Sequence, residues 1–177
     1  ARATPLLADR VRLAALELAE TLPGGDAARR AHALGFLTGG RLLGPFANER
    51  SAGFATDVGP ERAVDFAAEL PGKRRPVRWR TLPSRPQSPA VPLGQIVHPS
   101  EQSLVFVAYA LVAEQPIEAV LELGSTGSWA VFVNGTAHGD RHVERPMQYG
   151  QDTLVLPLQA GPNLVLLKLG HLEGAEF

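Results

Sequence analysis

Short apolar segments separated by turn residues make up the chain from Val105 to Leu169. Asn134-Gly135 lies between two of these segments, and both residue types readily adopt the positive φ angles that a two-residue hairpin turn requires. Gly161-Pro162 supplies a second turn. Short strands with turns at a spacing of roughly 8–12 residues are typical of an antiparallel β-sandwich, so the pattern predicts that fold.

The longest apolar run, Leu104–Val112, predicts a strand that is buried on both faces, and its β-branched residues favour a strand over a helix. Inward-facing residues of this strand and its neighbours are expected to supply much of the core. They are Val105, Val107, Leu121, Leu123, Val131, Val133, Leu154, Leu156, Leu164, Leu166 and Leu169.

The residues before this run predict shorter elements. A first strand is expected over Arg41–Phe46, ended by Gly44-Pro45. A surface loop over Asn48–Pro60 follows it. Ala63–Leu70 and Gly94–Val97 predict two further short strands.

A basic region surrounds a predicted strand over Val77–Thr81. Its members, without an acidic residue among them, are Lys73, Arg74, Arg75, Arg78, Arg80 and Arg85. Such a region can meet phosphates, but a platform for single-stranded nucleic acid needs aromatic residues beside the cations. Because side chains alternate between the two faces of a strand, Trp79 is expected on the face opposite to Arg78 and Arg80, together with Val77 and Thr81. A solvent-facing basic strand is therefore expected, with no nucleic-acid partner.

The first 40 residues have a different pattern. Apolar residues recur at helical spacing over Leu6–Ala19, Pro23-Gly24-Gly25 interrupts the spacing, and Asp26 is a suitable N-cap for a second short helix. The sequence thus predicts an N-terminal helical hairpin over residues 1–40, comparable to the end of a helical repeat region, and a β-sandwich module over residues 41–177.

Composition and charge exclude several classes of protein. The net charge of −1 creates no general attraction for nucleic acid or an anionic membrane. No apolar run reaches the roughly 18 residues of a membrane span. Without cysteine the chain forms no disulfide and no thiolate metal site. None of this distinguishes a cytoplasmic from an extracytoplasmic location, and we expect the chain to be a segment of a larger polypeptide.

An ordered set of short motifs points to a family. They are Leu43-Gly44-Pro45-Phe46 with Asn48, Gly53-Phe54, Pro60-Glu61, Pro71-Gly72-Lys73, Val77-Arg78-Trp79-Arg80, Ala108-Tyr109-Ala110, Leu123-Gly124-Ser125, Val133-Asn134-Gly135, Gln151-Asp152, and Leu158 with Ala160-Gly161 and Asn163. Together they resemble a bacterial galactose-binding-like jelly-roll module. Such modules occur in large multidomain proteins beside tetratricopeptide repeats or transglutaminase-like domains. The hairpin and last strand also look like the sugar-binding sandwich of family 2 glycoside hydrolases.

The resemblance spans about Leu42 to Leu169 and implies an all-β, antiparallel, two-sheet jelly-roll sandwich. The acidic turn that usually follows Leu-Gly-Ser in such modules is replaced by Thr126-Gly127-Ser128. This change argues against a calcium site in the turn.

One short segment combines residues of metal-binding type. On a strand, His138, Asp140 and His142 would share a face and could hold a zinc-like ion. If the hairpin instead ends at Ala137, Gly139 enters irregular backbone and the two imidazoles splay apart. We expect the second arrangement and no metal.

Tryptophan offers the other candidate ligand contact. Trp129 shares its alternating face with Val131 and Val133, so core packing is expected, although its position beside a turn makes it a better candidate for exposure than Trp79.

No set of residues in the sequence has the pattern of a catalytic centre. The segment 124–128 lacks the G-x-S-x-G pattern, no phosphate-binding loop occurs, and Glu118 and Glu122 lie on an ordinary predicted strand. We therefore expect a non-catalytic accessory module, without a cofactor, that docks other domains of its parent polypeptide or a protein partner. The alternative is a carbohydrate-binding module. Its candidate ligand residues are Trp129, His138, Asp140, Arg141 and His142.

Overall fold

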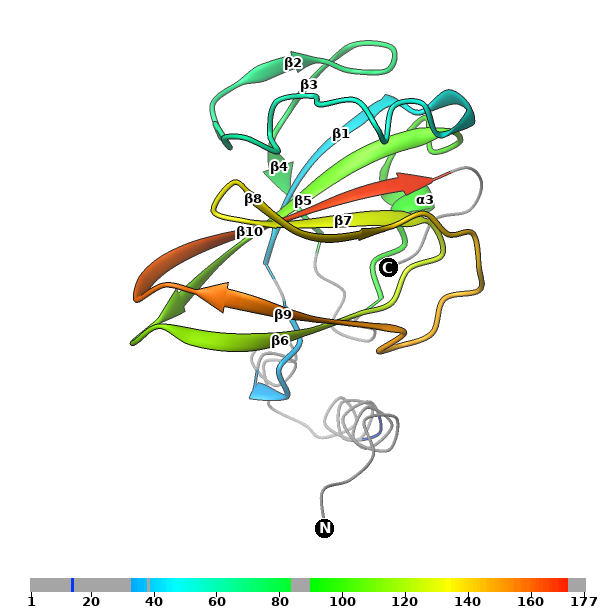
Figure 1. Cartoon of the computed structure of the whole chain (residues 1–177). Coiled ribbons are helices and arrows are strands. Elements are labelled where there is room, and N and C mark those ends of the chain that lie inside the picture. Colours follow the sequence, from blue (N-terminus) through cyan, green and yellow to red (C-terminus); the bar gives the residue numbers. More distant parts are fainter. Residues whose placement is uncertain (1–13, 15–32, 38, 84–89, 172–177) are drawn as a thin grey trace, which may run out of the picture.

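The computed structural model describes residues 14, 33–37, 39–83 and 90–171, and the regular secondary structure of this part of the chain consists mainly of antiparallel strands (Figure 1). The helical hairpin expected in the first 40 residues falls largely outside the described residues. The elements are β1 (Arg41–Ala47), the 3-10 turn η1 (Glu49–Ser51), β2 (Glu69–Pro71), β3 (Pro76–Arg78), β4 (Arg80–Thr81), α3 (Leu93–Ile96), β5 (Ser103–Ala113), β6 (Ile117–Leu123), β7 (Ser128–Val133), β8 (Thr136–Arg141), β9 (Asp152–Leu158) and β10 (Gly161–His171).

One large sheet organises the described part of the chain. Its strands follow the order β4-β1-β5-β10-β7-β8, and the central strands β5 and β10 pair from Gly161 opposite Ala113 to His171 opposite Ser103. Strands β6 and β9 form a second, two-stranded sheet, and β2 and β3 form a third. Figure 1 shows β6–β9 below the large sheet and β2–β3 above it. The all-β antiparallel architecture predicted from the sequence is thereby confirmed, and the arrangement is consistent with a sandwich, although the described residues form three sheets rather than two.

The large sheet has a hydrophobic core on each face. Val105, Val107 and Tyr109 of β5 belong to the core shared with β6–β9. Leu104 and Phe106 belong to the opposite core, which includes residues of segment 43–79. Burial on both faces, predicted from the apolar run, is confirmed over Ser103–Tyr109. Nine of the eleven predicted core residues are buried, and the other two, Leu121 and Leu164, are partly buried against the cores.

The β7–β8 hairpin turns at the predicted dipeptide. Asn134 has φ 51° and Gly135 has φ 80°. The Asn134 side chain also accepts a hydrogen bond from the Leu164 N–H at 2.8 Å and donates to Asn163 Oδ1 at 3.0 Å, which fixes the turn to β10. A Cβ at Gly135 would lie 2.7 Å from the Arg62 carbonyl oxygen. Glycine is thus required here both by its φ angle and by the closeness of a second backbone segment.

We expect Gly135→Ala to lower the free energy of unfolding by about 2 kcal/mol, because alanine at positive φ is strained and the Arg62 carbonyl must move. Urea denaturation measures the change. Gly161→Ala is the matched control, since its φ is 91° but nothing lies within 4 Å of its added Cβ. Equal losses in the two variants would contradict the role of the Arg62 contact.

Three local expectations were wrong. Strand β1 does not end at Gly44-Pro45 but continues to Ala47, with its register against β5 shifted between Leu43 and Phe46. A bulge of this kind tolerates proline, which has no N–H to pair. The strand expected over 94–97 is the short helix α3, because a brief apolar run suits either structure. Within 63–70, only Glu69 and Leu70 belong to a strand.

The segment expected as a surface loop over 48–60 is mostly exposed, but it also places three buried residues, Asn48, Phe54 and Pro60, against the molecule. Asn48 is buried, accepts a hydrogen bond from the Phe54 N–H at 2.9 Å, and donates its own N–H to the Gln102 carbonyl at 2.9 Å. Phe54 is buried in the second core.

The strand expected over 77–81 is interrupted at Trp79, and Thr81 is exposed rather than sharing the buried face. Val77 and Trp79 are buried and Arg78 and Arg80 exposed, as the alternation predicted.

Candidate functional site

The segment of possible metal ligands lies on β8. Phe132 is opposite Ala137 and Val131 is opposite Gly139, so His138 is the extra residue of a β-bulge. The expectation that pairing would fail at Gly139 was wrong, since β8 continues to Arg141.

Beyond the bulge, the side chains of β8 separate to two faces. Arg141 lies 3.1 Å from Asp152 of β9, whereas the His142 ring packs edge-on against Phe54 with 4.7 Å between centroids. His142 Nε2 is 3.7 Å from Asp140 Oδ2, and both side chains are well exposed. Within the described ranges, no group of three or more His, Asp or Glu side chains is placed to hold a metal ion. The histidines and Trp129 therefore do not form one site.

Trp129 lies in the core and is 4% exposed, less than Trp79 at 7%. Core packing is thus confirmed for both, and the expectation that Trp129 is the more exposed of the two was wrong. Its indole N–H donates to Asp152 Oδ2 at 2.7 Å. A ring held in this way offers no face on which a sugar can stack.

Asp152 joins β9 to the β7–β8 hairpin through three partners. Arg145 Nη2 donates to the same Oδ2 as Trp129, and Arg145 Nε donates to the Ser125 carbonyl. Arg141 Nη1 approaches the other carboxylate oxygen without the alignment of a hydrogen bond, so its attraction is coulombic. The arrangement is a structural clamp around a buried carboxylate.

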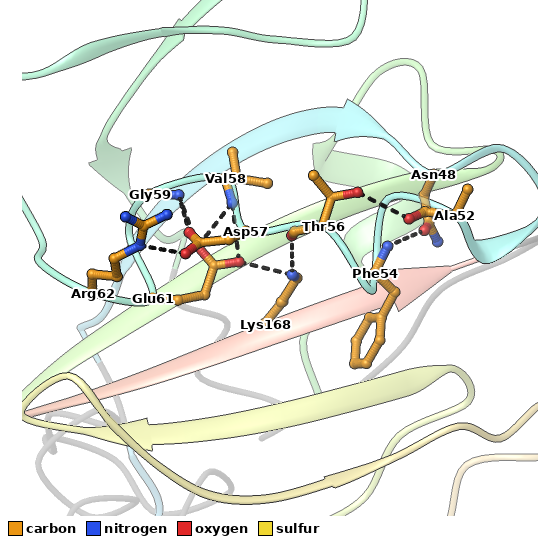
Figure 2. Close-up of polar contacts among 10 residues, drawn as sticks. All are labelled: Asn48, Ala52, Phe54, Thr56, Asp57, Val58, Gly59, Glu61, Arg62 and Lys168. Carbon is orange, nitrogen blue, oxygen red and sulfur yellow. Dashed lines mark hydrogen bonds and ion pairs between the residues drawn. The ribbon is translucent and has the colours of Figure 1, made fainter.

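A second buried ion pair lies on the other face of the large sheet (Figure 2). Lys168 of β10 donates from Nζ to Glu61 Oε1 at 2.7 Å and to the Thr56 carbonyl at 2.7 Å. Its side chain is 5% exposed and that of Glu61 8%. The ammonium group also lies 5.5 Å from the Phe54 ring centroid, within reach of a cation–π interaction.

Glu61 organises the loop that covers this face. It accepts hydrogen bonds from the Val58 and Gly59 N–H groups, while Asp57 accepts from Gly59 and pairs with Arg62 (Figure 2). Since the charges of Lys168 and Glu61 are matched and enclosed, we interpret this pair as the attachment of segment 54–62 to the sheet. A single lysine in the apolar strand 163–169 was the available sequence signal, but nothing in the sequence identified Glu61 as its partner.

The basic residues near β3 are largely occupied by protein groups. Lys73 donates to the Glu101 and Gln102 carbonyls and pairs with Glu49 at 3.0 Å, which lowers the pKa of that carboxyl. Arg78 pairs with Glu69, and Arg80 donates to the Ile96 carbonyl. These contacts account for much of the basic region without a nucleic-acid ligand.

The outer face of β6–β9 carries an apolar pair. Val120 lies directly opposite Val155, and they are 64% and 55% exposed. Glu118 and Glu122 lie two residues to either side of Val120, hence on the same face. Of the five exposed large hydrophobic residues in the described part of the chain, four belong to β5, β6 or β9; besides this pair they are Val112 and Ile117.

A pocket of about 350 Å³ opens between β6 and the large sheet. Its walls come from β5, β6, β9 and β10, with residues 34–37 and 147–150 beside them. The lining is mostly aliphatic, and its polar side chains are those of Tyr109, Glu122 and Tyr149. This pocket and the outer face of β6–β9 are the two candidate sites, and neither contains a residue proposed from the sequence as a ligand contact.

Two further results bear on what the chain can do. Within the described ranges, no helix has the length and apolar character needed to cross a membrane. No protein-family model matches this chain, and comparison with curated proteins finds none with significant similarity.

Proposed function

We propose that this chain is a non-catalytic docking module of the galactose-binding-like jelly-roll type, and that the outer face of β6–β9 is its contact surface. The observation that carries the proposal is the exposed cross-strand pair Val120–Val155 at the middle of the small sheet. Adjacent exposed valines in a sheet are suited to burial against a second surface. The resemblance of the motifs to modules of large multidomain proteins supports the same interpretation.

The charges on this face select the kind of partner. Exposed Glu118 borders the valines, so two copies of the chain placed face to face would bring like charges together. A different protein surface, with apolar residues bordered by Lys or Arg, is complementary. A saccharide is less suitable, because Trp129 is buried and bonded to Asp152 and no other tryptophan is exposed in the described part of the chain.

A photo-crosslinking residue at Val155, introduced in the cells that make the protein, tests the proposal. We expect a discrete adduct whose crosslinked segment contains an apolar residue beside Lys or Arg. Glu118→Lys should reduce its yield at least several-fold, because the charge complementarity is reversed. Glu144→Lys, at another exposed carboxylate, is the matched control and should leave the yield unchanged.

The same crosslinker at Ala110, an exposed residue of β5, gives the background. The proposal would be contradicted if Glu118→Lys did not reduce the yield of the adduct formed at Val155. It would also be contradicted if the crosslinker at Ala110 gave the same adduct in equal yield. Saturable saccharide binding in a calorimetric titration, lost on substitution of exposed Arg141, would favour the carbohydrate-binding alternative.

A further inference from the structure

The pocket beside β6 adjoins the proposed docking pair, because Val120 is one of its lining residues and Val155 is not. Its volume of about 350 Å³ is more than twice the roughly 150 Å³ of an apolar protein cavity that accommodates benzene. Leu121 and Leu156 line it from the small sheet, and Val165 and Leu167 line it from β10. A space of this size with mostly aliphatic walls suits an apolar group of about two fused rings.

Tyr109 supplies a polar group inside this apolar space. The residue is 5% exposed, yet its hydroxyl forms no hydrogen bond with any residue that the structure describes. Burial raises the pKa of Tyr109 to about 12, so the hydroxyl keeps its proton at neutral pH. The hydroxyl is not one of the fully enclosed polar atoms of the described residues, so it is reached from the pocket that Tyr109 lines. A ligand atom in the pocket can therefore accept its hydrogen bond in place of water.

The charge of the lining limits the ligand further. Glu122 is its one ionisable carboxylate, and no Lys, Arg or His lines the pocket among the described residues. An anionic ligand would lose its hydration among aliphatic walls that offer it no cation from these residues. A saccharide would leave most of its hydroxyls facing aliphatic walls.

We propose that this pocket binds a neutral, largely apolar small molecule that carries a hydrogen-bond acceptor, and that the Tyr109 hydroxyl donates to this acceptor. The site adjoins the docking face at Val120, which lines it, whereas the Val155 side chain does not line it. A substitution at Val155 therefore tests docking without altering the pocket lining.

Three naphthalene probes, titrated against the full chain by ligand-observed NMR, test the proposal. We expect saturable binding of 2-acetylnaphthalene, which is neutral and carries a ketone, and binding of 2-naphthoate that is at least about 10-fold weaker. Tyr109→Phe should lower the affinity for 2-acetylnaphthalene by about 3- to 10-fold, because one hydrogen bond is lost. The same variant should leave the affinity for 2-ethylnaphthalene unchanged, because this probe has no hydrogen-bond acceptor.

Variants that fill the pocket locate the binding. Ala119→Phe should abolish binding of both neutral probes, whereas Ala110→Phe, at an exposed residue that does not line the pocket, should preserve it. Met147→Trp narrows the pocket from the side of loop 147–150. It replaces Ala119→Phe in this test if the melting temperature shows that Ala119→Phe does not fold. Absence of saturable binding by both neutral probes would overturn the proposal. Binding of the neutral probes that persists in Ala119→Phe or Met147→Trp would also overturn it. The same holds if Tyr109→Phe weakens binding of 2-acetylnaphthalene and 2-ethylnaphthalene equally.

Discussion

Lys168→Met should lower the free energy of unfolding by about 3–5 kcal/mol, because it leaves the buried carboxylate of Glu61 without its cation. The Val58 and Gly59 N–H groups still donate to that carboxylate, but they are neutral and compensate only in part. Segment 54–62 should then detach from the sheet at lower denaturant concentration. Urea denaturation, compared with the unaltered chain, measures the loss.

The double variant Lys168→Met with Glu61→Gln separates the ion pair from the packing. Methionine fills much of the space of the lysine stem, and glutamine can still accept hydrogen bonds from the loop. The double variant should therefore be more stable than Lys168→Met alone, since no uncompensated charge stays buried. A loss below 1 kcal/mol in Lys168→Met would show that the pair is not enclosed as described.

Asp152→Asn is expected to cost about 3 kcal/mol of stability. The substitution preserves the shape of the side chain but removes the negative charge that binds Arg145 and attracts Arg141. The Trp129 N–H, buried at the same position, also loses an ionised acceptor. Thermal and urea denaturation should both show the loss, together with a change in Trp129 fluorescence.

Arg141→Gln provides the matched comparison for this clamp. The Arg141 side chain is 53% exposed, so solvent screens its attraction and its loss should cost less than about 1 kcal/mol. If Arg141→Gln were as destabilising as Asp152→Asn, the indole and Arg145 contacts would not be the main support of the carboxylate.

Local patterns were sufficient to predict the long central strand and much of the core. Asn134-Gly135 determines its turn by the φ angles of two adjacent residues, and the run around Phe106 is buried on both faces because β5 is central. The helix α3 was mistaken for a strand because four residues are too few for either period to show. Local patterns did not predict the bulge that carries β1 past Pro45 either.

Long-range pairing explains what could not be predicted. Residues 48–60 were expected as a surface loop, and most of them are exposed, but the burial of the adjacent Glu61 could not be predicted, because it depends on Lys168, 107 residues further along the chain. The burial of Trp129 followed from alternation, but its hydrogen bond to Asp152 did not. The pocket at Tyr109 arises from the space between two sheets, which no local pattern of residues describes.

Thiol labelling tests most directly whether the outer face of β6–β9 is a docking surface. The chain contains no cysteine, so a single Val155→Cys or Ala110→Cys substitution reports on one position. Each variant is labelled with a maleimide, once as the purified chain and once in the cells that make the protein. We predict that Val155→Cys reacts several-fold more slowly in the cells, while Ala110→Cys reacts at the same relative rate in both settings. Equal labelling of Val155→Cys in the two settings would contradict the docking function.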